Sequence, residues 1–273
     1  MNLNHLFSQS HALPTISKVV QELIIMLHDE NVSISEVARK IELDQVIAAK
    51  LLRLANSASY GRSRRIGSVD KAIQMLGFST TRALVISVGL SGCFKNIPNV
   101  DLPVFWRHCI RVACVARALA KPARVEPDLA FTLGLMYAIG HLLMALGLPE
   151  MEEFNVLHPL YSDARRAAEE ETFGYSFAEV SAELMQRWNF ATEFEAALLN
   201  FHMPLDVYPF EPLAGVLHLA VWRVFFEAQG QDLETMFDNW PHETAQRLGI
   251  SAAFIEALAQ PKDLTADLEV MLG

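Results

Sequence analysis

The sequence predicts an all-α protein, and three observations lead to this fold class. Apolar residues recur at helical spacing, as in Ile16, Val20, Leu23 and Leu27, and positions three or four apart share one face of a helix. N-capping signals precede several such segments. Sustained alternation of apolar and polar residues, which would indicate strands, does not occur between the turn signals. We therefore expect helices and no sheet.

Capping residues place the helices of the first third of the chain. Ser33 and Glu36 have the spacing of a capping box, in which each side chain binds a backbone N–H at the start of the same helix. Asp44 can cap the next helix. Ser68 begins another helix, and Gly77 is placed to end it.

The segment 96–101 is the best candidate for a boundary, because it is rich in turn residues and the charge changes sign across it. Residues 1–95 carry a formal net charge of +4, whereas residues 96–273 carry −14. We expect a helical N-terminal subdomain over 1–95 and a second helical subdomain over 96–273. The total charge of −10 argues against general nucleic-acid binding, because an acidic surface repels phosphates.

Prolines and further capping signals place the helices of the second part. Pro103 suits a first helical turn, and Pro127 begins a long uncharged element. Ser176 and Thr192 are each followed three residues later by a glutamate, which predicts two more capping boxes. The remaining helices are expected at about residues 212–229, 241–248, 251–259 and 263–272.

The run of 21 residues from 129 to 149 contains no charged side chain, so its length and composition permit a membrane span. Gly134, Gly140 and Gly147 interrupt it, no second such run follows, and a helix that is apolar all round is also typical of a protein core. The N-terminus lacks the basic and apolar regions of a signal peptide. We therefore expect a cytoplasmic protein that has no membrane partner.

Two groups of reactive side chains are expected to have no chemical role. The three cysteines Cys93, Cys109 and Cys114 form no C-x-x-C motif and lie in apolar helical surroundings, which indicates buried free thiols in a reducing compartment. The acidic run Glu169–Glu171 predicts a solvated helix face.

Two runs in the first third of the chain are unusually specific, residues 51–61 (L-L-R-L-A-N-S-A-S-Y-G) and 72–77 (A-I-Q-M-L-G). They resemble the N-terminal pattern of the HDOD domain family. Residues 134–140 are similar to its G-L-L-H-D-I-G stretch, and residues 105–108 to the helix that carries its first histidine. The resemblance covers approximately residues 12–225. It implies an all-helical bacterial signalling output domain, with the N-terminal subdomain packed on a degenerate HD-domain-like helical bundle.

The resemblance also implies where a metal site would lie. HD hydrolases hold a divalent ion with a histidine, an adjacent His-Asp pair and a distant aspartate, and the ion activates a water molecule. These four positions correspond to His108, Tyr137, Ala138 and Val221. Alanine and valine have no donor atom, and a neutral phenol is a poor ligand at pH 7, whereas three or four ligands must converge on a catalytic ion. We therefore expect no catalytic residues, no bound metal and no cofactor.

Three functions remain open at this point. The first is a non-catalytic regulatory module that binds an unknown signalling protein, or a small nucleotide, in a cleft between its halves. The second is a metal-dependent phosphohydrolase with an altered site, in which His141, His202 and His218 join His108 as a salvage set. The third is nucleic-acid binding through the N-terminal helices, because residues 33–57 have the pattern of a helix-turn-helix.

One loop adds a separate candidate contact. Tyr60, Arg62, Arg64 and Arg65 lie together in the sequence and could bind a partner or an anion. The alternative is that Gly61 makes a turn at positive φ and that the arginines are solvated.

Overall fold

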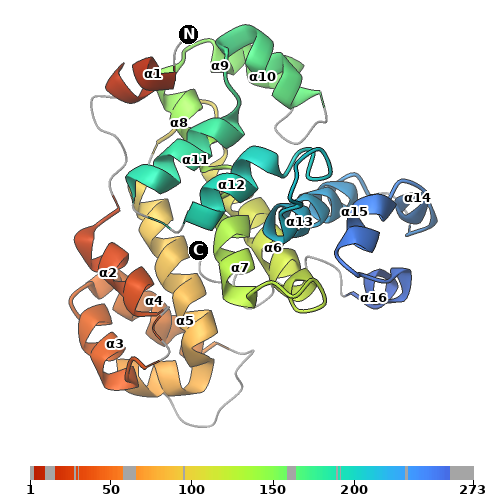
Figure 1. Cartoon of the computed structure of the whole chain (residues 1–273). Coiled ribbons are helices and arrows are strands. Elements are labelled where there is room, and N and C mark those ends of the chain that lie inside the picture. Colours follow the sequence, from red (N-terminus) through yellow and green to blue (C-terminus); the bar gives the residue numbers. More distant parts are fainter. Residues whose placement is uncertain are drawn as a thin grey trace. The chain divides into compact units, whose positions relative to one another are not determined.

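The computed structural model contains helices and connecting segments, and no strand, in the described residues (Figure 1), which confirms the expected all-α class. The described residues are 3–9, 16–27, 29, 31–57, 66–94, 96–158, 164–188, 190, 192–230 and 233–258. By their internal contacts the helices form two compact units that divide after residue 95. The first helix, α1 (Leu3–Gln9), belongs to the larger unit, and there its Leu6 side chain contacts the backbone position of Gly147.

The smaller unit is built around one long helix. It contains α2 (Lys18–Met26), α3 (Ile34–Ile41), α4 (Gln45–Ala55) and α5 (Val69–Cys93). The first three helices all contact α5. On α4, Ile47, Leu51 and Leu54 are buried, so its apolar face forms part of the core of this unit.

Two of the three caps expected from the sequence in this unit are formed by side chains, whereas Ser68 precedes α5 without a side-chain capping hydrogen bond. The Ser33 and Glu36 side chains form the reciprocal capping box, and the Asp44 carboxylate accepts hydrogen bonds from the N–H groups of Val46 and Ile47. At Gly77 the backbone adopts φ 79° and ψ 166°, so two helical segments meet there at a kink. A positive φ is accessible to glycine because it has no Cβ.

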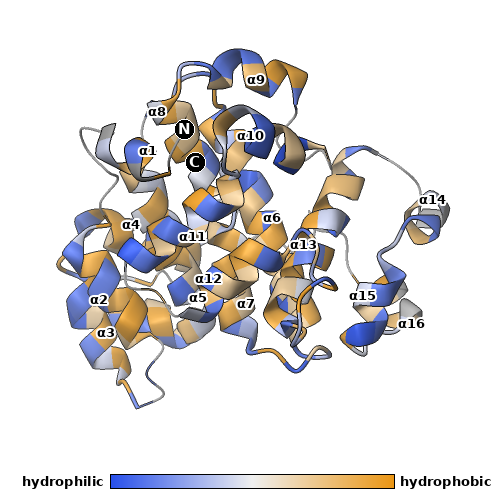
Figure 2. Cartoon of the chain, turned by 45° about the horizontal axis from the view of Figure 1, so that its top comes forward, coloured by the Kyte–Doolittle hydropathy of each residue, from blue (hydrophilic) through white to orange (hydrophobic). Residues whose placement is uncertain are grey.

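The larger unit holds α1 and all the helices after residue 95, and its innermost helices are the most hydrophobic (Figure 2). Helix α6 contacts α7 and α13, α11 contacts α8 and α12, and α12 contacts α13. The bounds of the helices are α6 (Leu102–Ala120), α7 (Pro127–Met136), α8 (Ile139–Gly147), α9 (Met151–Leu157), α10 (Arg165–Phe173), α11 (Phe177–Arg187), α12 (Thr192–Asn200), α13 (Pro212–Ala228), α14 (Leu233–Asp238), α15 (His242–Arg247) and α16 (Ala252–Ala257).

Most sequence-based helix signals in this unit are confirmed, and one is wrong. Ser176 and Glu179 form a capping box at the start of α11. Thr192, by contrast, is already the first residue of α12, and its hydroxyl donates to the neighbouring Glu193 carboxylate. A helical residue cannot act as the cap of its own helix. The helix expected at 263–272 lies outside the described residues.

Within the described part of the chain, two stretches are long and apolar enough to cross a membrane, Val69–Cys93 and Pro127–Gly147. Their mean hydropathies are 1.3 and 1.8, but 67% and 89% of the residues in these windows are buried inside the structure. The second stretch divides into α7 and α8 at Tyr137 and Ala138. Both stretches therefore have the burial of core helices, which is consistent with a soluble protein.

The three cysteines are free thiols. Cys109 and Cys114 are buried on α6, as expected, whereas Cys93 is partly exposed. Burial raises the pKa of the Cys114 thiol to about 12, so this thiol is protonated and unreactive at neutral pH.

Helices α8 and α11 approach each other closely at Gly140. The Gly140 N–H donates to Ser181 Oγ at 2.8 Å. A Cβ at this position would lie 2.6 Å from Ser181 N and closer still to the Phe177 carbonyl oxygen. Only a hydrogen atom fits there, because both of these neighbours are backbone atoms that cannot rotate away.

Replacing Gly140 with alanine is therefore expected to lower the free energy of unfolding by about 2–3 kcal/mol through overpacking. The measurement is urea denaturation followed by circular dichroism. The matched control is Gly92→Ala on α5, where an added Cβ would meet no atom within 4 Å; this change is expected to stabilise the helix by up to about 1 kcal/mol. Equal effects of the two substitutions would contradict the close approach.

Candidate functional site

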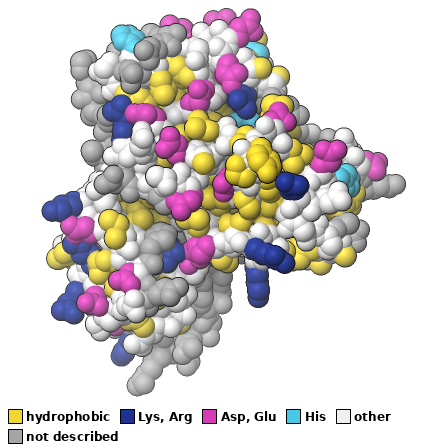
Figure 3. Space-filling view, in the orientation of Figure 1, with side chains coloured by type: hydrophobic (Ala, Val, Ile, Leu, Met, Phe, Trp, Pro, Cys, Tyr) yellow, Lys and Arg dark blue, Asp and Glu magenta, His cyan; other side chains and the backbone are white. Residues whose placement is uncertain are grey.

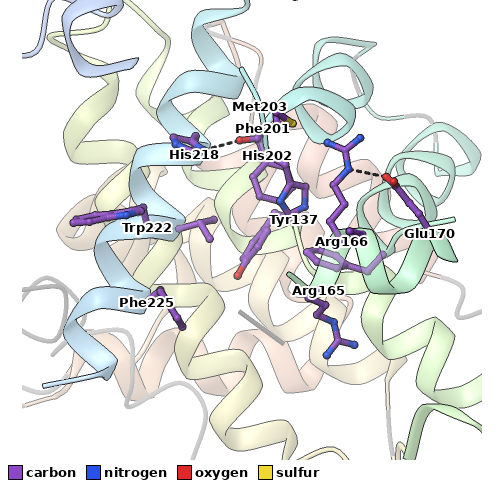
Figure 4. Close-up of a pocket in the computed structure, with 13 residues that line it drawn as sticks. Tyr137, Arg165, Arg166, Glu170, Phe201, His202, Met203, His218, Trp222 and Phe225 are labelled. Atoms are coloured by element: carbon purple, nitrogen blue, oxygen red, sulfur yellow. Dashed lines mark hydrogen bonds and ion pairs between the residues drawn. The ribbon is translucent and has the colours of Figure 1, made fainter. Parts of the chain in front are cut away.

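The larger unit contains a cavity of about 480 Å³ between α10, α13 and the segment that follows α12 (Figure 4). Its walls are mostly aromatic and hydrophobic, with a few polar side chains. The residues that line it are Tyr137, Arg165, Arg166, Ala167, Glu170, Phe177, Phe201, His202, Met203, His218, Val221, Trp222 and Phe225.

Two of the four positions that correspond to HD metal ligands line this cavity, namely Tyr137 and Val221. His108 is buried on α6 and its Nε2 lies 2.7 Å from the Tyr137 hydroxyl. Ala138 is fully buried at the start of α8 and does not line the cavity. The structure thus brings His108, Tyr137 and Val221 into one region, with the phenol between the imidazole and the cavity.

His108 is held in its neutral form. The pKa of this imidazole is lowered from 6.5 to about 3, chiefly by burial and to a smaller extent by the nearby Arg111 charge. The ring therefore carries one proton at neutral pH, and the hydrogen bond to Tyr137 uses Nε2 as either donor or acceptor. The Tyr137 ring also packs edge-on against Phe177 and Phe201, which fixes the phenol within an aromatic cluster.

The residues present do not fit a divalent metal ion. Ala138 and Val221 offer no lone pair, and the Tyr137 hydroxyl is engaged by His108. Among the described residues, no group of three or more histidine, cysteine, aspartate or glutamate side chains is arranged to hold a metal. A catalytic ion needs at least three converging protein ligands, so no reaction step can be derived through a metal here.

The four histidines of the salvage set do not converge. His202 and His218 line the cavity, but His141 lines a different cavity of about 220 Å³ with Phe105 and Asn155. The Nδ1 atom of His141 lies 3.1 Å from an Nη atom of Arg165. Because a guanidinium can only donate, Nδ1 must accept, and the ring proton is on Nε2. Neither nitrogen of His141 then has a lone pair for a metal.

Arg165 makes a buried network that connects four helices. Its Nε donates to Glu169 Oε1 at 2.6 Å, and its Nη atoms donate to Asn155 Oδ1 at 2.9 Å and to the carbonyl oxygen of His158 at 2.5 Å. The second Glu169 oxygen accepts the Phe177 N–H at 2.7 Å. Helices α8, α9, α10 and α11 are thereby held together through one ion pair.

The prediction of a solvated face at Glu169–Glu171 is therefore wrong for Glu169. Its side chain is 0% exposed, whereas Glu170 and Glu171 are exposed. Burial raises the pKa of the Glu169 carboxyl, and the Arg165 charge and the Phe177 N–H oppose that rise. The sequence contained one signal of this pair, the i, i+4 spacing of Arg165 and Glu169, but Arg166 and Glu170 have the same spacing on the exposed side.

His202 and His218 differ in what their ring nitrogens contact. His218 Nδ1 donates to the Phe201 carbonyl oxygen at 2.9 Å, because a carbonyl can only accept. The Nε2 atom of His202 is buried and has no hydrogen-bond partner among the described residues. Burial lowers the pKa of His202 to about 3, with contributions from Arg166 and His218. A buried polar atom of this kind needs a partner from outside the described residues, such as a water molecule or a ligand atom.

Comparison with known proteins identifies the family. The HDOD domain model matches residues 13–204, which is more than half of the chain. The chain belongs to the HDOD domain family. The matched residues of this HDOD chain include His108, Tyr137 and Ala138 and end before His218 and Val221.

Three relatives extend the comparison. An uncharacterised protein of Treponema pallidum (strain Nichols) is 24% identical over 245 residues, which are 84% of the HDOD chain but 44% of the relative, so the chain spans less than half of that protein. A crystal structure from Shewanella amazonensis SB2B, named as a candidate phosphohydrolase, is 27% identical to the HDOD chain, and the two structures superpose with a TM-score of 0.77. The match covers 98% of the HDOD chain and 96% of the Shewanella chain.

The third relative is a crystal structure from Marinobacter aquaeolei VT8, named as a candidate signal transduction protein. It is 22% identical with a TM-score of 0.75, and the match covers 95% of the HDOD chain and 58% of that structure. This structural similarity supports the assignment of the fold. Together with the Shewanella structure it places the HDOD chain among HD-like helical folds.

Most of the residues that line the cavity of the HDOD chain were not predicted from the sequence. Arg166, Glu170, Trp222 and Phe225 come together only when α10 and α13 pack in the same unit. The loop residues Tyr60, Arg62, Arg64 and Arg65, which were candidates for a partner or anion contact, lie outside the described residues.

Proposed function

We propose that this HDOD chain is a non-catalytic, cytoplasmic regulatory module of bacterial signal transduction, and that its larger unit binds a small ligand in the cavity beside Tyr137. The observation that carries the proposal is the hydrogen bond between Tyr137 and His108 at the position of the HD metal. This phenol and imidazole satisfy each other, so the region is stable without an ion.

The cavity supports binding of a small molecule. Its volume of about 480 Å³ falls in the range of about 300–1,000 Å³ that is usual for ligand pockets. Aromatic walls with a few polar groups are also typical of such pockets. A signalling protein remains a second type of partner, and Figure 3 shows hydrophobic side chains gathered on one face near α12 and α13. Met203, Leu205 and Tyr208 are exposed there.

The name of the Shewanella relative raises the alternative of phosphohydrolase activity. That activity in HD proteins depends on a metal-activated water, and the ligand positions of this chain hold tyrosine, alanine and valine. The helix-turn-helix alternative is less favoured, because Leu51 and Leu54 of α4 are buried against its own unit.

The test is elemental analysis of the purified chain together with a phosphoesterase assay on p-nitrophenyl phosphate in the presence of Mn²⁺. We expect substoichiometric Zn, Mn and Fe, and no cleavage that EDTA abolishes. Stoichiometric metal with EDTA-sensitive cleavage would overturn the proposal. A salt-dependent mobility shift with duplex DNA would favour nucleic-acid binding instead.

A further inference from the structure

The cavity has two chemically different ends, and this asymmetry restricts its ligand. In Figure 4, Trp222 and Phe225 lie on one side, Arg166 and Glu170 on the other, and Tyr137 and His202 between them. We infer that the ligand is a planar aromatic molecule that carries one anionic group, with its ring among the aromatic side chains and its anion between Arg166 and His202. This inference rests on the proposed ligand-binding function.

The aromatic end can enclose a flat ring. The Trp222 indole is held in place, since it stacks on Phe226 with ring centroids 4.5 Å apart and packs edge-on against Trp240. Phe201 is in turn packed against Tyr137. Aromatic rings fixed in this way favour a planar guest, because stacked and edge-to-face contacts add to the burial of apolar surface.

Among the described residues at the polar end, Arg166 is the cation whose Nη atoms have no hydrogen-bond partner. Arg166 Nε donates to Glu170 Oε1 at 2.7 Å, and both side chains are partly exposed. Arg165, the other cation on the wall, is bound to Glu169 and to acceptors outside the cavity. Arg166 is therefore the guanidinium that can offer its Nη donors to an anion.

His202 supplies a second donor at the same end. Its Nε2 is buried without a partner in the described residues, and Arg166 lies near enough to affect its protonation. The ring is neutral at pH 7, and in its Nε2–H tautomer it can donate one hydrogen bond without adding charge. An anionic oxygen at this point would satisfy the Nε2–H donor and pair with Arg166 at once.

The Glu170 carboxylate disfavours binding of an anion, so its removal should have the opposite effect to removal of Arg166. This carboxylate competes with the ligand for Arg166 and repels a negative charge. Arg166→Gln is therefore expected to weaken binding of an aromatic anion about tenfold, which is the usual effect of losing a charged hydrogen bond. Glu170→Gln is expected to strengthen binding roughly threefold, which is the usual effect of an exposed ion pair.

A pair of fluorescent probes separates the contribution of the anion from that of the ring. The anion is 1-anilinonaphthalene-8-sulfonate, and N-phenyl-1-naphthylamine is its analogue without the sulfonate. Titration of the full chain with each probe gives two dissociation constants. We expect the two Gln variants to shift the constant of the sulfonate probe in opposite directions and to leave the constant of the neutral probe unchanged.

Two controls define the site. Val221→Trp fills the cavity and is expected to abolish saturable binding of both probes. Arg187→Gln removes another partly exposed arginine whose Nε lies 2.7 Å from a glutamate oxygen at i−4, but Arg187 does not line the cavity, so no change is expected. Circular dichroism and the thermal midpoint check that each variant is folded.

The outcomes separate the two proposals. Equal affinity for both probes and no response to Arg166→Gln would overturn the anion inference and leave ligand binding intact. Absence of saturable binding of either probe, or binding that persists in Val221→Trp, would overturn the cavity as a ligand site. Competition for the bound sulfonate probe by indole-3-acetate or by adenosine monophosphate then distinguishes an aromatic carboxylate from a nucleotide, and failure of both to compete would also contradict the inference.

Discussion

Replacing Glu169 with alanine is expected to lower the free energy of unfolding by about 3–5 kcal/mol, which is the usual cost of removing one partner of a buried ion pair. The substitution removes the Glu169 carboxylate that pairs with the Arg165 guanidinium, which is buried at 1% exposure. It also removes the acceptor of the Phe177 N–H at the start of α11. Each group would then lose a charged hydrogen-bond partner in the protein interior.

The measurement is equilibrium denaturation in urea, with Glu171→Ala as the control. Glu171 lies on the same helix and is exposed, so this variant reports the helix-propensity change alone. A double variant in which Arg165 and Glu169 both become methionine is expected to lose less stability than the sum of the two single variants, because no unpaired charge remains. A loss below about 1 kcal/mol in Glu169→Ala, typical of an exposed ion pair, would contradict the buried network.

Acid is expected to destabilise the protein well above the pH at which carboxylates titrate. The pKa values of His108, His141 and His202 are lowered from 6.5 to about 3, chiefly by burial and to a smaller extent by nearby arginine charges. Between these values the unfolded chain binds more protons than the folded chain. The stability that depends on these neutral rings is complete above about pH 6.5 and is lost progressively as the pH falls toward 3.

Each histidine is expected to contribute about 1.4 kcal/mol per pH unit in this window, so the three together give roughly 4 kcal/mol per unit. Urea denaturation at pH 7.5, 6.0 and 5.0 measures the slope. His141→Gln keeps an acceptor for Arg165 and is expected to reduce the slope by about a third, whereas His242→Gln, at an exposed position, is expected to leave it unchanged. A parent slope near zero between pH 6.0 and 5.0 would show that these rings are accessible to protons in the folded state.

Local signals in the sequence were sufficient for much of the fold. The capping boxes at Ser33 and Ser176 and the kink at Gly77 depend on residues within one turn of each other. Their hydrogen bonds and backbone angles can therefore be anticipated without the rest of the chain. Thr192 had the same local pattern as Ser176, but its helix begins one residue earlier, at Thr192 itself, because helix ends are set by packing as well as by capping residues.

The candidate site could likewise be predicted from the sequence only in part. Tyr137, Ala138 and Val221 could be assigned to vestigial HD positions through the family resemblance, and their weakness as metal ligands follows from the residue types alone, because alanine and valine have no donor atom and a neutral phenol is a poor ligand. The burial of Glu169 could not be anticipated, because Glu169 and Glu170 are adjacent and both have an arginine four residues earlier. Which of the two faces the interior depends on the orientation of α10 toward Phe177.

The sequence by itself determined that the chain is helical, that it belongs with HDOD domains, and that three of its four HD positions, at Tyr137, Ala138 and Val221, hold no suitable metal ligand. Tertiary structure alone decided that the Tyr137 hydroxyl meets His108, that Arg165 and Glu169 are sealed in the interior, and that Arg166 and His202 face one aromatic cavity. The physical reason is the separation along the chain over which each kind of interaction acts. Periodicity, capping and donor chemistry act within a few residues, whereas a cavity and a buried charge depend on helices that are distant in the chain and adjacent in space.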